Sequence, residues 1–428
     1  MNSVLALSAI VLLVLLFLKV PVYLSVLGGS AVYFILNPTI NTIMFAQRAI
    51  TSVESISLLA IPFFVCAGIL MNYTGVTKRI LDFCSVLTGR MSGGLAQVNI
   101  LLSTLMGGLS GSNLADAAME AKMLVPEMEA KGFSKEFSTV VTAASSMITP
   151  LIPPGIAMIL YGCIANVSIG KLFMSGLGIG TFLCVSMMIL VRFISVKRGY
   201  QPLYTEKVPA KEFIAAVKPA ILPLCLPIII IGGIRLGIFT ATEAGAIAIL
   251  YAIILGAVYK ELDLKNTFTG LRETVCTTSS IMLIVAAASA FSWILTKERI
   301  PQQLTEWIVT TIDNKYIFLL VINIFLLIVG MFIEGNASMI ILVPLLAPIA
   351  ANYGIDEIQF AMIYIFNNAI GALSPPMGTL MFVTCGITQC KTAAFIKEAV
   401  PFYILLVIDL LVITYIPVVS TFLINILY

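Results

Sequence analysis

Long apolar runs alternate with short polar stretches from Val4 to Ile426. About 20 apolar residues suffice for a helix to cross a ~30 Å hydrocarbon core, whereas β-barrel strands show weaker alternating segments of about ten residues. The pattern therefore predicts an all-α polytopic membrane protein. The predicted spanning segments are residues 4–20, 21–36, 57–71, 137–165, 172–194, 213–234, 240–258, 274–295 and 402–424.

Two pairs of apolar segments are shorter than a spanning helix and meet at polar residues. Residues 93–108 and 114–128 are joined through Gly-Ser-Asn at 111–113, and residues 317–332 and 339–350 are joined through residues 334–338. A helix of about 15 residues is roughly 23 Å long, which is less than the thickness of the hydrocarbon core. We therefore expect two re-entrant hairpins, residues 93–128 and 317–350, with their tips inside the membrane.

An apolar segment interrupted by proline and glycine follows each predicted hairpin. SSMITPLIPPGIAMILYGCI begins at Ser145 and NNAIGALSPPMGTLMFVTCGI begins at Asn367, so the double prolines coincide at an offset of 222 residues. Because proline cannot continue the hydrogen-bond pattern of a helix, we expect two broken helices, residues 137–165 and 358–389. Five crossings between equivalent points would make the second copy an inverted repeat, a feature typical of secondary transporters.

The repeat also suggests how the chain divides into functional parts. The basic connection at residues 195–218 separates the two copies and is predicted to be cytoplasmic by the positive-inside rule. The expected units are N-terminal scaffold helices (1–56), the first repeat of a transport domain (57–194), the basic loop with central scaffold helices (195–273), the second repeat (274–389) and a C-terminal scaffold helix (390–428).

Composition narrows the range of functions. The net charge of +3 gives no reason to expect a nucleic-acid partner, and the chain has no histidine. Without histidine, histidine-ligated haem, most zinc sites and histidine-based acid–base catalysis are absent, and no P-loop motif is present for a nucleotide. We therefore expect neither an enzyme nor a haem, zinc or nucleotide cofactor.

The interrupted backbone predicts ion binding. Irregular backbone at membrane depth lies inside protein or lines a cavity, and its free carbonyl oxygens can hold a hard cation such as Na⁺. We expect each tip to face its own broken helix and to form a sodium site, giving two or more sites. The predicted sodium ligands are Ser110, Ser112, Asn113, Ser145, Ser146, Thr149 and Pro150 in the first copy, and Gly335, Asn336, Ser338, Asn367, Asn368, Gly371 and Ser374 in the second.

The substrate would lie between the two ion sites. The predicted substrate-binding residues are Ser112, Asn113, Pro154, Gly155, Asn336, Pro376 and Gly378. A purely structural interpretation competes with this one, because serine and asparagine also cap helices and proline also kinks them. Among acids in apolar stretches, Asp116 and Glu334 are functional candidates, whereas Glu243 is better explained as a helix cap close to Thr240.

Several of these motifs together resemble one family. GGLSGSNLADAA with the Val-Pro that follows it, SSMITPLIPPGIAMILYG, GIFTATEAGA, GMFIEGNASMIILVP and LSPPMG are similar, in order, to the large membrane (M) subunit of tripartite ATP-independent periplasmic (TRAP) transporters. The resemblance covers essentially the whole chain. Ala241 departs from the family pattern, in which proline is common at this position; this should affect local helix geometry more than activity.

The resemblance implies a subunit of the bacterial inner membrane that imports an organic acid on a Na⁺ gradient by an elevator movement. The best single substrate is a sialic acid, with C4-dicarboxylates and keto acids as the alternatives. The implied partners are the lipid bilayer, a periplasmic substrate-binding (P) protein and a small membrane (Q) subunit on a separate chain. A stand-alone Na⁺/carboxylate symporter, a channel and an intramembrane enzyme remain as rival interpretations.

Overall fold

The computed structural model describes residues 3–18 and 20–427, and this part of the chain is helical without a β-strand. The prediction of an all-α protein is thus confirmed. Residues 1, 2, 19 and 428, which belong to the predicted terminal segments, lie outside the described residues. In chain order the elements are α1 (Ser3–Phe17), α2 (Val22–Leu36), α3 (Ile43–Val53), η1 (Ile56–Leu59), α4 (Ala60–Asn72), α5 (Val76–Thr88), α6 (Gly94–Ser110), α7 (Asn113–Ala130), α8 (Lys135–Ser145), η2 (Thr149–Leu151), α9 (Ile156–Ala165), α10 (Ile169–Arg198), α11 (Ala210–Arg235), α12 (Ala241–Tyr259), α13 (Leu264–Lys297), α14 (Ile300–Thr311), α15 (Lys315–Phe332), α16 (Gly335–Asn352), α17 (Glu357–Leu373), α18 (Thr379–Thr388), α19 (Thr392–Tyr415) and α20 (Pro417–Leu427).

Membrane-spanning candidates are numerous in the described part of the chain. Six helices are long and apolar enough to cross a membrane, or up to nine spans if each of three bent helix pairs counts as one. One bent pair is the first predicted broken helix, where α8 with η2 meets α9 at 41°. Helices α15 and α16, the arms of the second predicted hairpin, are among the six, so the re-entrant course of this hairpin stays a prediction.

The helix boundaries of the two copies correspond at the predicted offset. Shifting α7 by 222 residues gives residues 335–352, which are the bounds of α16. Shifting α8 gives a start at 357, where α17 begins, and shifting α9 and α10 gives starts within one residue of α18 and α19. Each Pro-Pro bond in the two breaks is cis. The inverted relation of the two copies stays a prediction.

The two copies interlock around the breaks. Helix α18 of the second copy packs against α7 of the first hairpin, and α9 of the first copy packs against α16 of the second hairpin. Within the second copy, α15 packs extensively along α17. Because each broken helix contacts the other copy's hairpin, the two hairpin tips are brought toward a common centre.

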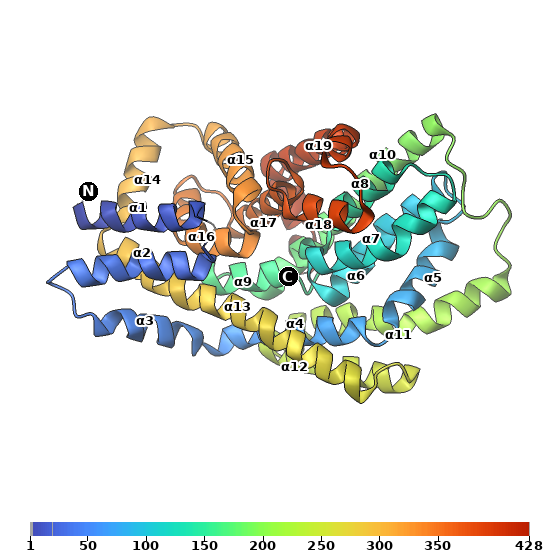
Figure 1. Ribbon diagram of the computed structural model, residues 1–428, viewed down its shortest axis with the longest axis horizontal. Helices are drawn as coiled ribbons and strands as arrows, with labels where there is room; N and C mark the ends of the chain where they lie inside the picture. The colour runs from blue at the N-terminus through green and yellow to red at the C-terminus, as the bar shows by residue number, and fades with distance from the viewer. Residues whose placement is uncertain (1–2, 19, 428) are drawn as a thin grey trace.

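The remaining helices surround this centre. Figure 1 shows α1, α2 and α3 side by side at one end of the long axis, and α13 packs against α2, α3 and α4. Helix α4 has its most extensive packing with α12, although the sequence placed it in the transport domain. The domain boundaries stay a prediction, and this packing favours grouping α4 with the scaffold.

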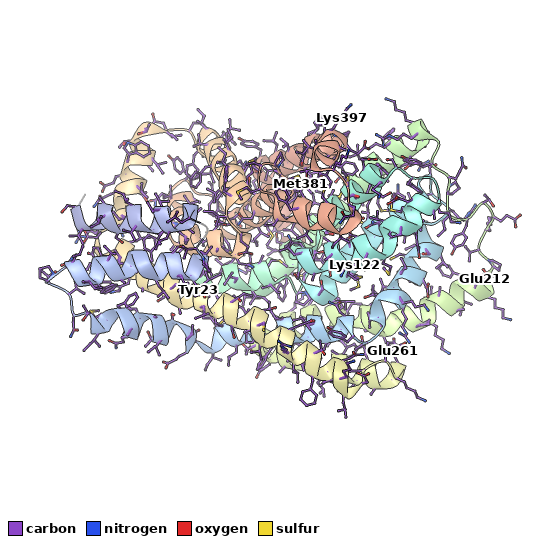
Figure 2. All side chains as sticks on the ribbon, in the orientation of Figure 1. Tyr23, Lys122, Glu212, Glu261, Met381 and Lys397 are labelled. Atoms are coloured by element: carbon purple, nitrogen blue, oxygen red, sulfur yellow. The ribbon has the colours of Figure 1, made fainter. Side chains whose placement is uncertain are left out.

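Charge distribution gives an orientation. Figure 2 places Glu212, at the start of α11, and Glu261, in the α12–α13 connection, at the same end of the molecule. The chain around both carries basic residues: Lys207 and Lys211 near the first, Lys260 and Lys265 near the second. By the positive-inside rule, this end is predicted to face the cytoplasm.

Candidate ion and substrate site

The tip of the first hairpin is a two-residue turn between α6 and α7. Gly111 ends α6 with φ +64°, a conformation that suits glycine, and Ser112 caps α7 by accepting a hydrogen bond from the Ala115 amide. A Cβ on Gly111 would lie 2.8 Å from the Pro154 carbonyl oxygen. Glycine therefore allows the tip to approach the break between α8 and α9 closely, as the sequence predicted.

A buried carboxylate connects this tip to the broken helix. Asp116 is fully buried, and its Oδ2 accepts hydrogen bonds from Ser110 Oγ at 2.6 Å and from Thr149 Oγ1 at 3.1 Å. Its Oδ1 has no hydrogen-bond partner among the described residues. Ser110 and Thr149, two of the predicted ligands, are thus joined through an acid that had been named only as a functional candidate.

A second buried acid lies one helical turn further along α7. Glu120 Oε2 accepts a hydrogen bond from Ser103 Oγ at 2.6 Å, while Oε1 has no partner within the described chain. Ser103 also contacts Ser145 Oγ at 2.8 Å, and Asn99 Nδ2 donates to Thr142 Oγ1 at 2.7 Å. These side chains form a polar seam between α6, α7 and α8, in which the predicted ligand Ser145 takes part.

Ser146 belongs to the same region but bonds to its own helix, donating to the Thr142 carbonyl at 2.7 Å. Glu120, Ser103 and Asn99 were missed by the sequence interpretation. The sequence did contain a signal for these residues. Asn99 and Ser103, and likewise Asp116 and Glu120, are polar residues spaced by four, which places each pair on one face of a helix.

The second tip is shorter than predicted. Helix α16 already begins at Gly335, so residues 335–338 form its first turn and only Ile333 and Glu334 connect the two arms. The reason is a cap: Glu334 Oε2 accepts from the Ala337 amide at 3.0 Å, and Oε1 accepts from Asn336 Nδ2 at 2.9 Å. The predicted tip at residues 334–338 is corrected accordingly.

The second tip contacts its own broken helix through Ser338 and Asn368. Ser338 Oγ donates to Asn368 Oδ1 at 3.0 Å, and Asn368 Nδ2 donates to the Gly335 carbonyl at 3.4 Å. Asn367 points elsewhere, because its amide donates to Asn323 Oδ1 on α15 at 2.8 Å. The predicted pairing of tip and break is therefore seen for Asn368, whereas Asn367 joins α17 to α15.

The other predicted residues of the two breaks form close backbone packing. Gly371 lies against Gly330, and Ser374 Oγ donates to the Ile370 carbonyl of its own helix at 2.8 Å. Gly155 and Gly378 are the N-caps of α9 and α18, following Pro154 and the Pro376–Met377 segment. Glycine has no side chain to accept from the first amides of these two helices, so neither start has a side-chain cap from its own N-cap residue.

Both tips line one cavity of about 140 Å³. The first copy contributes Gly111, Ser112, Asn113 and Pro150, the second contributes Glu334, Gly335, Asn336 and Asn368, and α13 contributes Thr277 and Ile281. Hydroxyl, amide and carbonyl oxygens from two pseudo-equivalent elements thus converge at the centre of the protein. Oxygen donors of this kind suit hard cations, and the starts of half-helices suit anions.

Glu334 orients Asn336 in this cavity, which gives a prediction. In Glu334→Gln one acceptor is replaced by an amide donor, so Asn336 Nδ2 or the Ala337 amide loses its partner. We expect the Na⁺ concentration for half-maximal stabilisation of the purified protein to rise roughly tenfold, the equivalent of one lost hydrogen bond to a charged group. Thermal unfolding over a series of Na⁺ concentrations measures this, with the exposed Glu306→Gln as the control. Equal Na⁺ dependence in both variants would contradict it.

A bundle of spanning helices whose paired hairpin tips meet in one polar cavity defines a helical membrane transport protein. Residues 9–419 match the sequence model of the tripartite ATP-independent periplasmic transporter, DctM component. The chain belongs to this family of TRAP transporter large permeases, whose members are inner-membrane proteins.

Relatives with different substrates match nearly the whole chain. It is 39% identical to the sialic acid TRAP transporter large permease SiaM of Vibrio cholerae, with 94% of each chain covered. It is 34% identical to the C4-dicarboxylate large permease DctM of Pseudomonas aeruginosa, with 92% of each covered. It is 35% identical to the isethionate permease DctMQ of Oleidesulfovibrio alaskensis, covering 88% of this chain and 59% of that one.

A solved structure shares the fold. The YdaH transporter of Alcanivorax borkumensis superposes with a TM-score of 0.61 at 12% identity, with 89% of each chain covered. TRAP large permeases work with a periplasmic binding protein and usually with a small permease. The DctMQ relative shows that the small permease can be part of the same chain, so its presence on a separate chain is a proposal here.

Proposed function

We propose that the chain is the large permease of a Na⁺-coupled importer that takes an organic acid anion from a periplasmic binding protein. The observation that supports this most is the single cavity lined by both hairpin tips. Two clusters of oxygens, each with one acid (Asp116 in the first and Glu334 in the second), suit two sodium ions, and the space between them suits a carboxylate. A sialic acid is the first candidate substrate because of the Vibrio cholerae relative, followed by C4-dicarboxylates and keto acids.

The proposed mechanism is an elevator movement. The two hairpins and broken helices would move as one unit, since α18 packs on α7 and α9 packs on α16. Helices α4, α12 and α13 would stay fixed, together with a small permease on a separate chain. This places α13 in the scaffold, although residues 274–297 were predicted to belong to the second repeat, because α13 packs against α2, α3 and α4. Sodium binding between tip and break would hold each hairpin closed over the substrate, so that movement without substrate or ion is disfavoured.

Uptake into proteoliposomes tests this proposal. The chain and its small permease are reconstituted, and labelled sialic acid, succinate and a keto acid are supplied with or without binding protein and an inward Na⁺ gradient. We expect one of the acids to accumulate only when both the binding protein and the inward Na⁺ gradient are present. Accumulation without the binding protein would instead identify a stand-alone Na⁺/carboxylate symporter, and downhill flux indifferent to Na⁺ would refute the sodium sites.

A further inference from the structure

A second cavity, of about 640 Å³, lies between α3 and α13 on one side and α9 and α16 on the other. We call it the Arg48 cavity. It adjoins the central cavity. Ile281 of α13 and Met339 of α16 line the central cavity. Val285, one turn further along α13, and Ile340, the next residue of α16, line the Arg48 cavity. The two cavities are therefore neighbours along α13 and α16.

The Arg48 cavity has an unbalanced positive charge. Among its described lining residues Arg48 is the one basic side chain, and none is acidic. Arg48 takes part in none of the ion pairs formed by the described residues. Its guanidinium carbon lies 5.9 Å from the centre of the Trp293 ring, which also lines the cavity. A guanidinium held beside a ring at the wall of a cavity is suited to bind a carboxylate through two hydrogen bonds.

Hydroxyl groups make up the other polar lining. They belong to Ser52, Ser55, Ser289, Ser292 and Thr296. Ser52 and Thr296 donate their own protons to helix carbonyls, of Ala49 and Ser292 respectively, so that their oxygens remain available as acceptors. Acceptors of this kind suit hydroxyl groups of a ligand.

Size also separates the two cavities. Sites for small organic molecules occupy roughly 300–1,000 Å³, a range that includes the Arg48 cavity and excludes the central cavity of about 140 Å³. In this conformation the Arg48 cavity, and not the central cavity, therefore has the volume of a site for a whole hydroxylated acid.

We propose that the Arg48 cavity is a staging site: it binds a hydroxylated organic acid, with the carboxylate on Arg48 and the ligand hydroxyls on the hydroxyl groups of α3 and α13, before the acid enters the central cavity. This inference rests on the proposed function only for the direction of passage. Binding itself requires neither Na⁺ nor the binding protein, so it can be tested separately.

Transport kinetics give the first test. We expect Arg48→Gln to raise the KM for the acid about tenfold or more, with the maximal rate and the Na⁺ dependence little changed. The KM of Arg48→Lys should lie between those of the wild type and Arg48→Gln. Lys315→Gln is the matched control, because Lys315 also rests on an aromatic ring, 5.3 Å from the centre of Tyr316, and lines none of the cavities described above. A lower maximal rate at unchanged KM, or an unchanged KM, would overturn the staging site while leaving the importer intact.

Fluorescence of Trp293 gives a second test that does not depend on transport. The chain has two tryptophans, so Trp307→Phe on α14 leaves Trp293 as the single reporter. The purified full chain is titrated with sialic acid, and with succinate as an acid without hydroxyls. We expect a saturable change that is at least about tenfold weaker for succinate, lost in Arg48→Gln, and reduced in the Ser289→Ala, Ser292→Ala double variant. Absence of any change, or equal titrations in wild type and Arg48→Gln, would refute the site.

Discussion

Asp116→Ala is expected to abolish Na⁺-driven uptake, with a loss of more than about a hundredfold. The substitution removes two hydrogen bonds to one carboxylate oxygen, from Ser110 at the tip and Thr149 at the break. Bonds to a charged group contribute about 1.5–3 kcal/mol each, and each 1.4 kcal/mol is a factor of ten in an equilibrium constant. The tip would then no longer be held against the broken helix in the geometry of the first sodium site. Initial uptake rates in proteoliposomes measure the loss.

Two further variants identify the cause of this loss. Asp116→Asn keeps an acceptor oxygen but removes the charge, so it should retain part of the tip–break contact and still bind Na⁺ poorly. Glu127→Ala, which removes an exposed acid from the same helix, should transport normally. Stabilisation of the purified protein by Na⁺ against thermal unfolding should disappear in both Asp116 variants and persist in Glu127→Ala. Near-normal uptake by Asp116→Ala would contradict the assigned role of this carboxylate.

Gly371→Ala should strongly lower the stability of the folded protein. A Cβ at this position would lie 2.5 Å from the Cα and the carbonyl carbon of Gly330, both of which are backbone atoms that cannot rotate away. Helices α15 and α17 must then separate, and overpacking of this kind costs about 1–3 kcal/mol or more. We expect a clearly lower unfolding temperature of the purified protein, together with reduced uptake, because Gly371 lies in the last turn of α17, directly before the second break.

Gly386→Ala is the matched control for this prediction. Gly386 is also a helical glycine in the second copy, on α18, but a Cβ added there would meet no atom of the described chain within 4 Å. Alanine favours a helix over glycine by up to about 1 kcal/mol, so this variant should be as stable as the wild type or slightly more stable. Equal unfolding temperatures for the two variants would refute the close approach of α15 and α17.

Much of the local structure could be predicted from the sequence because the signals are local. The double prolines at 153–154 and 375–376 each remove two adjacent amide donors, and the helices break there, whereas single prolines such as Pro223 of α11 lie inside continuous helices. Thr240 followed by Glu243 predicted a cap, and both bonds of the capping box are present. The predicted bounds of the second tip were wrong because the Glu334 side chain caps α16. The helix therefore begins at Gly335, and the tip is shorter than predicted.

Contacts between distant segments could not be predicted in the same way. Asn367 and Asn368 are neighbours of the same type, yet one bonds to α15 and the other to the second tip. The difference follows from the turn of about 100° per helical residue, which directs adjacent side chains to different neighbours. Ser145 likewise contacts Ser103 instead of the tip, and Glu120 became a candidate only when α6 and α7 were seen to share a buried seam.

The sequence by itself determined that this protein is a helical membrane protein of the TRAP large-permease type, with two tips and two breaks in matching positions. Apolar run length, proline and glycine are sufficient for the helical membrane architecture with its tips and breaks, because they act within one or two helical turns, whereas the family was inferred from the resemblance of several motifs. Only the tertiary structure decided that both tips line one cavity, that Asp116 joins tip to break and that Arg48 lies beside a second cavity. These features depend on how helices hundreds of residues apart pack together, and many different helix faces could satisfy the same apolar pattern.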